Sequence, residues 1–357
     1  MHTQAYVEMI VPPDGGWGWV IVAASFMCNL VVDGIMFSYG VFFDHIKQHY
    51  NATSAQVSLA GSLQTGFYLM AGPFVSALAN RYGFRMVSIL GAFIACNAFL
   101  LSYFANSIEL LYVFYGILGG IGAGLIYVPA VITTGFYFEK WRALATGISV
   151  CGSGIGTLVM APISQALIAH MGWRGAIVVQ AERAGKAGID SNTATLLISV
   201  IGIGNTIGRI GLGYVSSLPG VDALTVNNIF ITLSGFLTIA SGLSMSQGYQ
   251  FFYAAAFGLS VSVFASLRSI IVVDLMGLEK LTNAFGLLLL FQGVGAVVGS
   301  PIASAFVDGT GSHTLAFYFA GFDHHTLGCH LLPVAHRINE KEKRQQALRE
   351  VPILLKT

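Results

Sequence analysis

The sequence predicts an all-α protein that crosses a membrane many times. Of its 357 residues, 55% are hydrophobic and only 9% are charged, whereas a soluble domain carries about 25% charged residues. A chain this apolar has too little polar surface to cover a soluble core, so we expect it to lie in a lipid bilayer. The 43 glycines fit this prediction, because small residues let membrane helices approach closely. The formal net charge of +1 implies no nucleic-acid partner.

Long apolar runs mark the expected membrane spans, each close to the ~20 residues that a spanning helix needs. Nine spans are expected, at 17–43, 57–79, 86–104, 110–136, 143–168, 195–215, 229–245, 251–273 and 284–306. A weaker tenth run at 314–332 is interrupted by Asp323, His324 and His325. The segment at 172–192 reads GWRGAIVVQAERAGKAGIDSN, and its apolar piece is too short to span. We therefore predict a loop there, which divides the chain into two halves.

Loop charges predict the orientation, because cytoplasmic loops carry an excess of Lys and Arg. Basic residues follow the second and fourth expected spans, precede the ninth and gather in the tail. The chain should then begin and end in the cytoplasm. The expected organisation is an N-terminus at 1–16, an N-terminal helix bundle at 17–171, a connecting segment at 172–192, a C-terminal bundle at 193–335 and a tail at 336–357.

Three ionisable residues fall inside expected spans: Asp33, Arg209 and Arg268. A charge at membrane depth costs at least about 2.5–3.5 kcal/mol on insertion scales, so each should face a polar cavity or a partner. Arg209 can bind an anionic substrate, since a guanidinium pairs bidentately with a carboxylate; packing against a carbonyl or an acid is the alternative. Asp33 can pair with Arg209 or Arg268, or carry a proton. Arg268 can form a structural ion pair with Asp33 or a second anion contact.

Other kinds of site find little support in the sequence. The four cysteines, at 28, 96, 151 and 329, show no CxxC spacing, so neither a disulfide framework nor a metal site is expected. The glycine-rich stretch GILGGIGAG at 116–124 follows no strand and indicates helix packing rather than nucleotide binding. No Ser/His/Asp or paired-carboxylate arrangement is visible, so we expect neither an enzyme nor a cofactor.

Five motifs stand out along the chain: PPDGGWGW at 12–19, NRYGFR at 80–85, YFEKWRALATGISVCGSGIGT at 137–157, GWRG at 172–175 and LLISVIGIGNTIGR at 196–209. Together they resemble the motifs of the monocarboxylate transporter family, a branch of the major facilitator superfamily. The resemblance covers nearly the whole chain and is closer to the poorly characterised members of that family than to its lactate carriers. It implies twelve helices in two halves. Here ERAGKAGID at 182–190 is similar to the stretch before the family's helix eight, so most of helix six, the central loop and helix seven are missing, leaving about ten helices.

The resemblance implies a plasma-membrane carrier of monocarboxylates or related small organic anions that works by alternating access. Arg209 falls on the family's helix-eight arginine, which contacts the substrate carboxylate. Asn205, one turn earlier, stands where lactate carriers have an aspartate; it can hydrogen-bond a substrate or a neighbouring helix. Phe37 aligns with a lysine implicated in coupling substrate to protons, so the usual lactate–proton cotransport does not carry over directly. Coupling to H⁺ and a single-span accessory glycoprotein are left open.

A second group of residues is expected at the cytoplasmic face. Asp14, Gly15, Trp17 and Trp19 should anchor the first span at the membrane interface, and in the family this motif matters for conformational coupling or folding. Arg81, Arg85 and Arg142 should bind helix ends and acids and so latch one conformation. Plain positive-inside anchoring is the alternative for these arginines.

Two functions follow from these observations. The first is a secondary transporter of small carboxylates, proton-coupled or not. The second is a truncated isoform that does not transport and acts by associating with other membrane proteins, and the broken segment at 172–192 motivates it.

Overall fold

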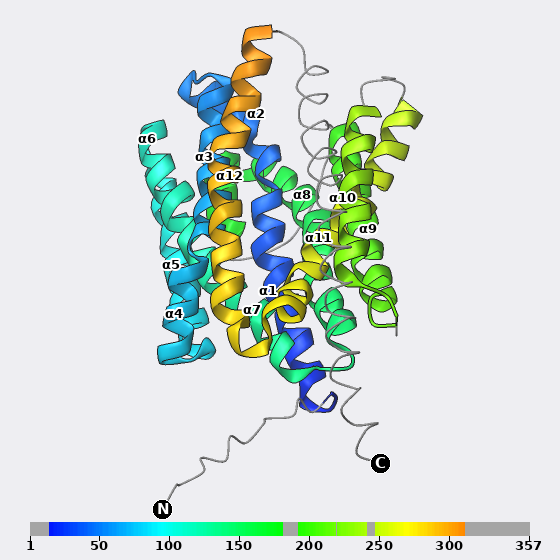
Figure 1. Cartoon of the computed structure of the whole chain (residues 1–357). Helices are drawn as coiled ribbons and strands as arrows, with labels where there is room; N and C mark the ends of the chain where they lie inside the picture. The colour runs from blue at the N-terminus through cyan, green and yellow to red at the C-terminus, as the bar shows by residue number, and fades with distance from the viewer. Residues whose placement is uncertain (1–13, 181–191, 219, 241–246, 311–357) are drawn as a thin grey trace, which may run out of the picture.

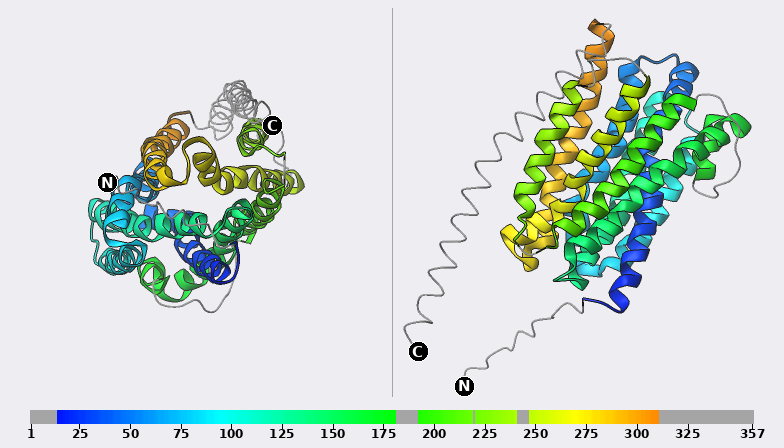
Figure 2. Two further views of the ribbon diagram at one scale, coloured as in Figure 1. Left: turned by 60° about the horizontal axis from the view of Figure 1, so that its bottom comes forward. Right: turned by 90° about the vertical axis from the view of Figure 1, so that its right-hand side faces the viewer.

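The computed structural model describes residues 14–180, 192–218, 220–240 and 247–310, and within these ranges the chain is helical throughout apart from short turns (Figures 1 and 2). The α-helices are α1 (Trp17–Phe37), α2 (Tyr39–Tyr50), α3 (Ser54–Met70), α4 (Gly72–Tyr82), α5 (Phe84–Tyr103), α6 (Ile108–Leu111), α7 (Gly119–Tyr137), α8 (Arg142–Gln180), α9 (Asn192–Val215), α10 (Ala223–Ala240), α11 (Gln247–Met276) and α12 (Leu281–Thr310). A π-helical stretch, Tyr112–Leu118, joins α6 to α7.

Seven helical segments of the described chain are long and apolar enough to cross a membrane, fewer than the nine expected. The run at 57–79 is divided, because α3 ends at Met70 and α4 begins at Gly72 with Pro73 in its first turn. Proline removes a backbone donor and so favours a helix start at this point. The run at 195–215 forms α9, which is also not among the seven. The weaker run at 314–332 lies outside the described residues.

The prediction of a loop from 172 onward was wrong for its first part. Helix α8 kinks at Gly172, whose φ of 71° is left-handed, and then continues to Gln180. Trp173 and Ile177, four residues apart, are buried in a cluster with Ile46 and Phe99. These contacts hold the short apolar piece in a helix although it is too short to span. Residues 181–191 lie outside the described part of the chain.

The two halves of the chain meet along two seams, visible in Figure 1. In one seam α12 packs on α3 and α4, and in the other α9 packs on α8. Within the N-terminal half α1 packs on α8 and α7, and within the C-terminal half α9 packs on α11.

Paired glycines bring the backbones of the two halves together in both seams. A Cβ on Gly72 of α4 would lie 2.7 Å from the Gly286 carbonyl oxygen of α12, and one on Gly147 of α8 would lie 2.5 Å from the Arg209 carbonyl oxygen of α9. Distances this short leave no room for a side chain, so these contacts depend on glycine.

The seams close one end of the bundle, where the α4–α5, α7–α8 and α11–α12 turns lie. The Ser76 hydroxyl donates a hydrogen bond to the Thr282 carbonyl oxygen at 2.8 Å, and Asn80 Nδ2 donates to Asn283 Oδ1 at 3.2 Å. In the other seam the Leu144 N–H donates to Ser217 Oγ at 3.2 Å. We call this the closed end.

We predict that Gly72→Val destabilises the protein by about 1–3 kcal/mol, because the new side chain must push α4 away from α12. The measurement is thermal unfolding of the purified chain in detergent. Gly295→Ala is the matched control, since a Cβ there meets nothing within 4 Å and the substitution should stabilise α12 by about 0.5–1 kcal/mol. Equal melting temperatures for wild type and Gly72→Val would contradict the close backbone contact.

Candidate functional site

A chamber of about 490 Å³ lies between the two halves. Side chains from α1, α3, α7, α8, α9, α11 and α12 line it, and they include five residues singled out from the sequence: Asp33, Phe37, Asn205, Arg209 and Arg268. The structure therefore brings together residues that lie more than 200 positions apart in the chain.

Arg209 is buried on the chamber side of the α8–α9 seam. Its Nη1 donates a hydrogen bond to the Val150 carbonyl oxygen of α8. Its Nε is buried and has no hydrogen-bond partner among the described residues. Close packing of Gly147 on the Arg209 backbone fixes the position of the residue. The guanidinium is thus held on one side only, with an N–H left to bind an acceptor.

Asp33 pairs with a tyrosine and not with an arginine. The Tyr68 hydroxyl of α3 donates a hydrogen bond to Asp33 Oδ1 at 2.6 Å, and both residues are buried. The charges of Arg209 and Arg268 act on Asp33 through space, but within the described chain no ion pair joins it to either. Of the two roles that the sequence left open for Asp33, the ion pair with one of these arginines is not formed in the described chain, and the role of proton carrier stays a prediction. Tyr68 was not predicted, because a tyrosine in an apolar run carries no signal that separates it from packing.

Arg268 is stabilised mainly by aromatic rings. Its guanidinium carbon lies 5.3 Å from the ring centre of Tyr127 and 5.4 Å from that of Phe285, distances typical of cation–π contacts. Its Nη1 donates a hydrogen bond to Gln292 Oε1 of α12 at 3.2 Å. Arg268 is therefore a cation with neutral partners, which leaves its positive charge uncompensated at close range.

Asn205 and Phe37 complete the predicted set. Asn205 lies one turn before Arg209 on α9, and its buried Oδ1 has no partner in the described chain. Phe37 ends α1, and 51% of its surface is exposed. Its ring therefore lines the chamber without being packed into the protein core.

The chamber continues into a vestibule at the end of the bundle opposite the closed end. This second space has a volume of about 410 Å³ and shares Met36, Phe37 and Thr65 with the chamber. Its other lining residues come from α2, α3 and α12. The vestibule therefore adjoins the chamber on the α2–α3 side, away from the closed end.

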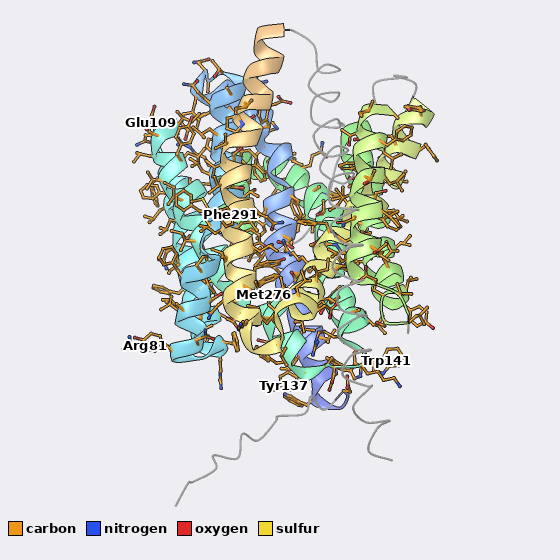
Figure 3. All side chains as sticks on the ribbon, viewed as in Figure 1. Arg81, Glu109, Tyr137, Trp141, Met276 and Phe291 are labelled. Atoms are coloured by element: carbon orange, nitrogen blue, oxygen red, sulfur yellow. The ribbon has the colours of Figure 1, made fainter. Side chains whose placement is uncertain are left out.

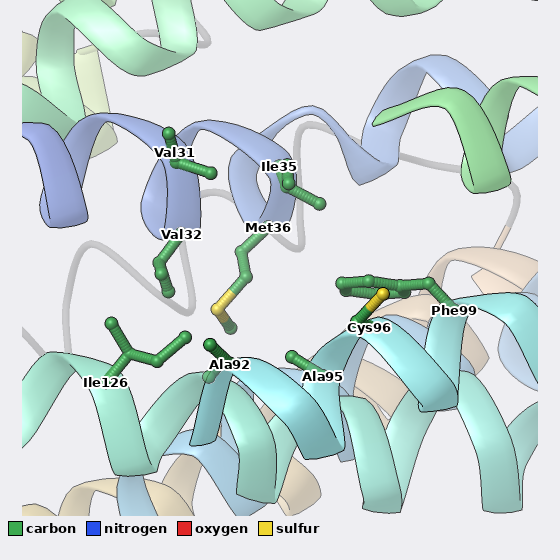
Figure 4. A pocket seen from close by; sticks show the side chains of 10 residues that line it. Val31, Val32, Ile35, Met36, Ala92, Ala95, Cys96, Phe99 and Ile126 are labelled. Carbon is green, nitrogen blue, oxygen red and sulfur yellow. The ribbon is translucent and has the colours of Figure 1, made fainter. Parts of the chain in front are cut away.

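A further hollow of about 220 Å³ lies between α1, α5 and α7 (Figure 4). Its walls are apolar side chains, among them Val32, Ile35 and Phe99, and no charged residue lines it. Met36 borders both this groove and the chamber. The groove offers no group that could bind an anion.

Asp14 ties the start of α1 to the α7–α8 turn. Its N–H donates to the Tyr137 carbonyl oxygen at 3.2 Å, and its carboxylate accepts hydrogen bonds from the N–H groups of Glu139 (2.8 Å), Lys140 (3.2 Å) and Trp141 (3.4 Å). Burial acts to raise the pKa of Asp14, but these three donors and the Arg142 cation outweigh it, so the pKa lies below its usual value.

The other residues predicted at this face lie at the closed end but do not form one cluster. The Trp19 ring packs edge-on against Phe138 with centres 4.9 Å apart, and Arg142 Nε donates to the carbonyl oxygens of Gly135 and Phe138. Gly15 accepts a bond from the Gly18 N–H, and Trp17 is exposed.

Arg81 and Arg85, by contrast, are exposed. Figure 3 shows Arg81 across the bundle from Tyr137 and Trp141 at the same end. Arg81 stacks on its neighbour Tyr82, with no acidic partner in the described chain. Arg142 binds a helix end, and the latching role of Arg81 and Arg85 stays a prediction beside the alternative of anchoring at the membrane interface.

Replacing Asp14 should weaken the link between α1 and the α7–α8 turn. We expect Asp14→Ala to lower the free energy of unfolding by about 0.5–2 kcal/mol at neutral pH, as loss of a capping carboxylate does elsewhere. Asp14→Asn should lose less, because the amide oxygen accepts hydrogen bonds and asparagine tolerates the φ of 45° found at this position.

The pH dependence of this effect has a definite sign. Because the folded-state pKa of Asp14 is lowered, its contribution is complete above the unfolded pKa of about 3.9 and is lost as pH falls through the folded value. Unfolding curves of wild type and Asp14→Ala should therefore converge in acid. A gap that stays constant from pH 7 down to the acid limit would contradict the assigned hydrogen bonds.

Comparisons with known proteins agree with this architecture. The Major Facilitator Superfamily profile matches residues 25–181. Human monocarboxylate transporter 11 is 26% identical over 382 aligned residues, covering 87% of this chain and 81% of the relative. Monocarboxylate transporter 12-B of Danio rerio is 24% identical, covering 97% and 93%, and monocarboxylate transporter 3 of Mus musculus is 26% identical, covering 87% and 78%. The described part of the chain is therefore all-α, residues 25–181 match the Major Facilitator Superfamily model, and most of the chain is similar to monocarboxylate transporters.

Proposed function

We propose that this chain is a secondary transporter of small organic monocarboxylates and that Arg209 binds the carboxylate group. The observation that carries the proposal is a buried guanidinium whose Nε has no described partner, in a chamber between two halves of a carrier fold. Asn205, one turn away on α9, supplies a second polar group toward the same anion.

The fixed charges of the chamber favour a monoanion. Arg209 and Arg268 contribute two positive charges and Asp33 one negative charge. One carboxylate bound together with a proton on Asp33 leaves the net charge of this set at +1, the value of the empty chamber with ionised Asp33, so the anion adds no uncompensated charge at membrane depth. Arg268, with its aromatic and amide partners, then sets the charge of the chamber more than it contacts substrate.

Alternating access requires the closed end to open while the vestibule shuts. The few hydrogen bonds across the closed end, such as Asn80–Asn283 and Ser76–Thr282, are the contacts that must break. Asp14, Trp19 and Arg142 hold α1, α7 and α8 together during that movement. With both termini in the cytoplasm of a plasma-membrane protein, the vestibule faces the outside.

The Asp33–Tyr68 pair is the proposed site of proton coupling. The groups whose charge acts on Asp33 are Tyr68 of α3, Arg209 of α9 and Arg268 of α11. Phe37 cannot take a proton, and neither can Asn205. Protonation of Asp33 would leave the two arginines free to hold an anion, and its release would restore the empty chamber's charge.

A second candidate function is association without transport. Alignment with the 12-B relative extends over 443 residues, more than this chain contains, so the relative has segments with no counterpart here. A chain that inserts into the membrane, carries no carboxylate and co-purifies with a full-length transporter would favour this candidate.

We expect Arg209→Ala to lower uptake of a labelled short carboxylate into proteoliposomes by roughly 30-fold or more, because truncating a buried charged contact costs about 2–5 kcal/mol. Arg209→Lys keeps the charge but lacks the planar fork, and should recover only part of the uptake. Lys280→Ala, which removes an exposed cation at the α11–α12 turn, is the matched control. Equal uptake by wild type and Arg209→Ala would exclude Arg209 as the anion site.

The variant Asp33→Asn tests whether Asp33 carries the coupled proton. Wild-type uptake should rise when the outside is made more acidic than the inside, whereas the variant should ignore the gradient and still exchange labelled for unlabelled carboxylate. Tyr68→Phe, which removes only the hydroxyl bonded to Asp33, should shift the pH at which uptake responds. Persistence of gradient-driven uptake in Asp33→Asn would place the proton elsewhere.

A further inference from the structure

We infer that the monocarboxylate taken by this chamber has a large apolar body, of about six or more carbons, in contrast to a two- or three-carbon acid. The inference rests on the proposed function and names its substrate class. Three features of the described residues support it: the size of the chamber, the place of its charges and the nature of its remaining walls.

The chamber is large for a short acid. Its volume of about 490 Å³ lies within the 300–1,000 Å³ of sites that enclose drug-sized ligands. It shares Met36, Phe37 and Thr65 with the vestibule of about 410 Å³, so further space adjoins the chamber in that direction. A three-carbon acid would touch only a small part of this surface.

Few charged side chains line the chamber. Along most of its wall, a second anionic group on the ligand would therefore find no cation to pair with. Arg209 and Arg268 each have a buried Nε without a partner in the described chain, but Arg268 is in addition enclosed by the rings of Tyr127 and Phe285 and by Gln292. Asp33 repels anions. One carboxylate therefore has a place, and a second would have to displace the rings around Arg268.

Apolar side chains form much of the other lining. Met36 and Phe37 of α1, Leu69 of α3, Ile201 of α9 and Val261 and Phe264 of α11 all border the chamber. Phe37 stands at the junction with the vestibule, and half of its surface is free to be covered. Covering these groups favours a ligand with an apolar body, since affinity then rises by about fourfold for each buried methylene.

Straight-chain carboxylates from acetate to octanoate provide the test. Binding of each is measured on the purified full chain in lipid nanodiscs, as the rise in unfolding temperature with ligand concentration. We expect the dissociation constant to fall by about threefold to fourfold per methylene and then to level off when the chamber is filled. Primary alcohols of the same lengths report partition into lipid and should show no such saturable gain.

Two variants test whether the gain in affinity with chain length arises from contacts in the chamber. Phe37→Ala should flatten the dependence on chain length, because it removes the exposed ring from the path of the ligand. Phe93→Ala, on α5 with 68% of its side chain exposed and away from the chamber lining, should keep the wild-type slope. An unchanged slope in Phe37→Ala would overturn the assignment of this wall.

The outcomes separate the inference from the proposed function. If acetate and octanoate bind equally well and Arg209→Ala abolishes both, the carboxylate site stands and the large apolar body is refuted. If no carboxylate of any length binds to a correctly folded chain, the proposed function itself fails. A length-dependent gain that is the same in wild type and Arg209→Ala would show lipid-like partition and would also refute the inference.

Discussion

Placing two guanidiniums at membrane depth is the constraint on which the rest of this structure depends. Neither Arg209 nor Arg268 has an acidic partner within bonding distance in the described chain, so each must be stabilised by carbonyl, amide and aromatic groups. Those groups come from α7, α8 and α12, which obliges the two halves to meet around the same point. The chamber is the space that this arrangement leaves, and its positive charge follows from the shortage of acids.

Asp33 lowers the positive charge of the chamber but does not neutralise it. Its hydrogen bond to Tyr68 satisfies one carboxylate oxygen inside the N-terminal half, so the acid does not lock the two halves together as an ion pair across them would. Contacts between the halves include close glycine backbones, a few neutral hydrogen bonds, the hydrogen bond from Arg209 to the Val150 carbonyl oxygen and the cation–π contact of Arg268 with Tyr127. A carrier needs such contacts to be broken and re-formed at little cost in free energy.

Much of the site was predictable from the sequence, because charged residues inside apolar runs are rare and stand out. Asp33, Arg209 and Arg268 were found this way, and the family resemblance added Asn205 and Phe37. Tyr68, Tyr127 and Gln292 were not predicted, since nothing in a single apolar run tells a ring that stacks on a cation from one that faces lipid. The helix from Trp173 to Gln180 was missed for a related reason: its stability comes from tertiary packing against Ile46 and Phe99, which periodicity over eight residues cannot reveal. The break between α3 and α4 did have a signal, the Gly72–Pro73 pair, inside a run that hydropathy alone joins.

The glycine pairs of the two seams have an evolutionary consequence. At Gly72 and Gly147 any side chain would collide with the backbone of the opposite half, whereas the chamber walls are side chains that can be exchanged for others of similar volume. Selection can therefore act on the two parts separately. Substitutions at positions such as Phe37 and Phe264 can therefore change the substrate of the proposed carrier, while the interface between its two halves stays the same.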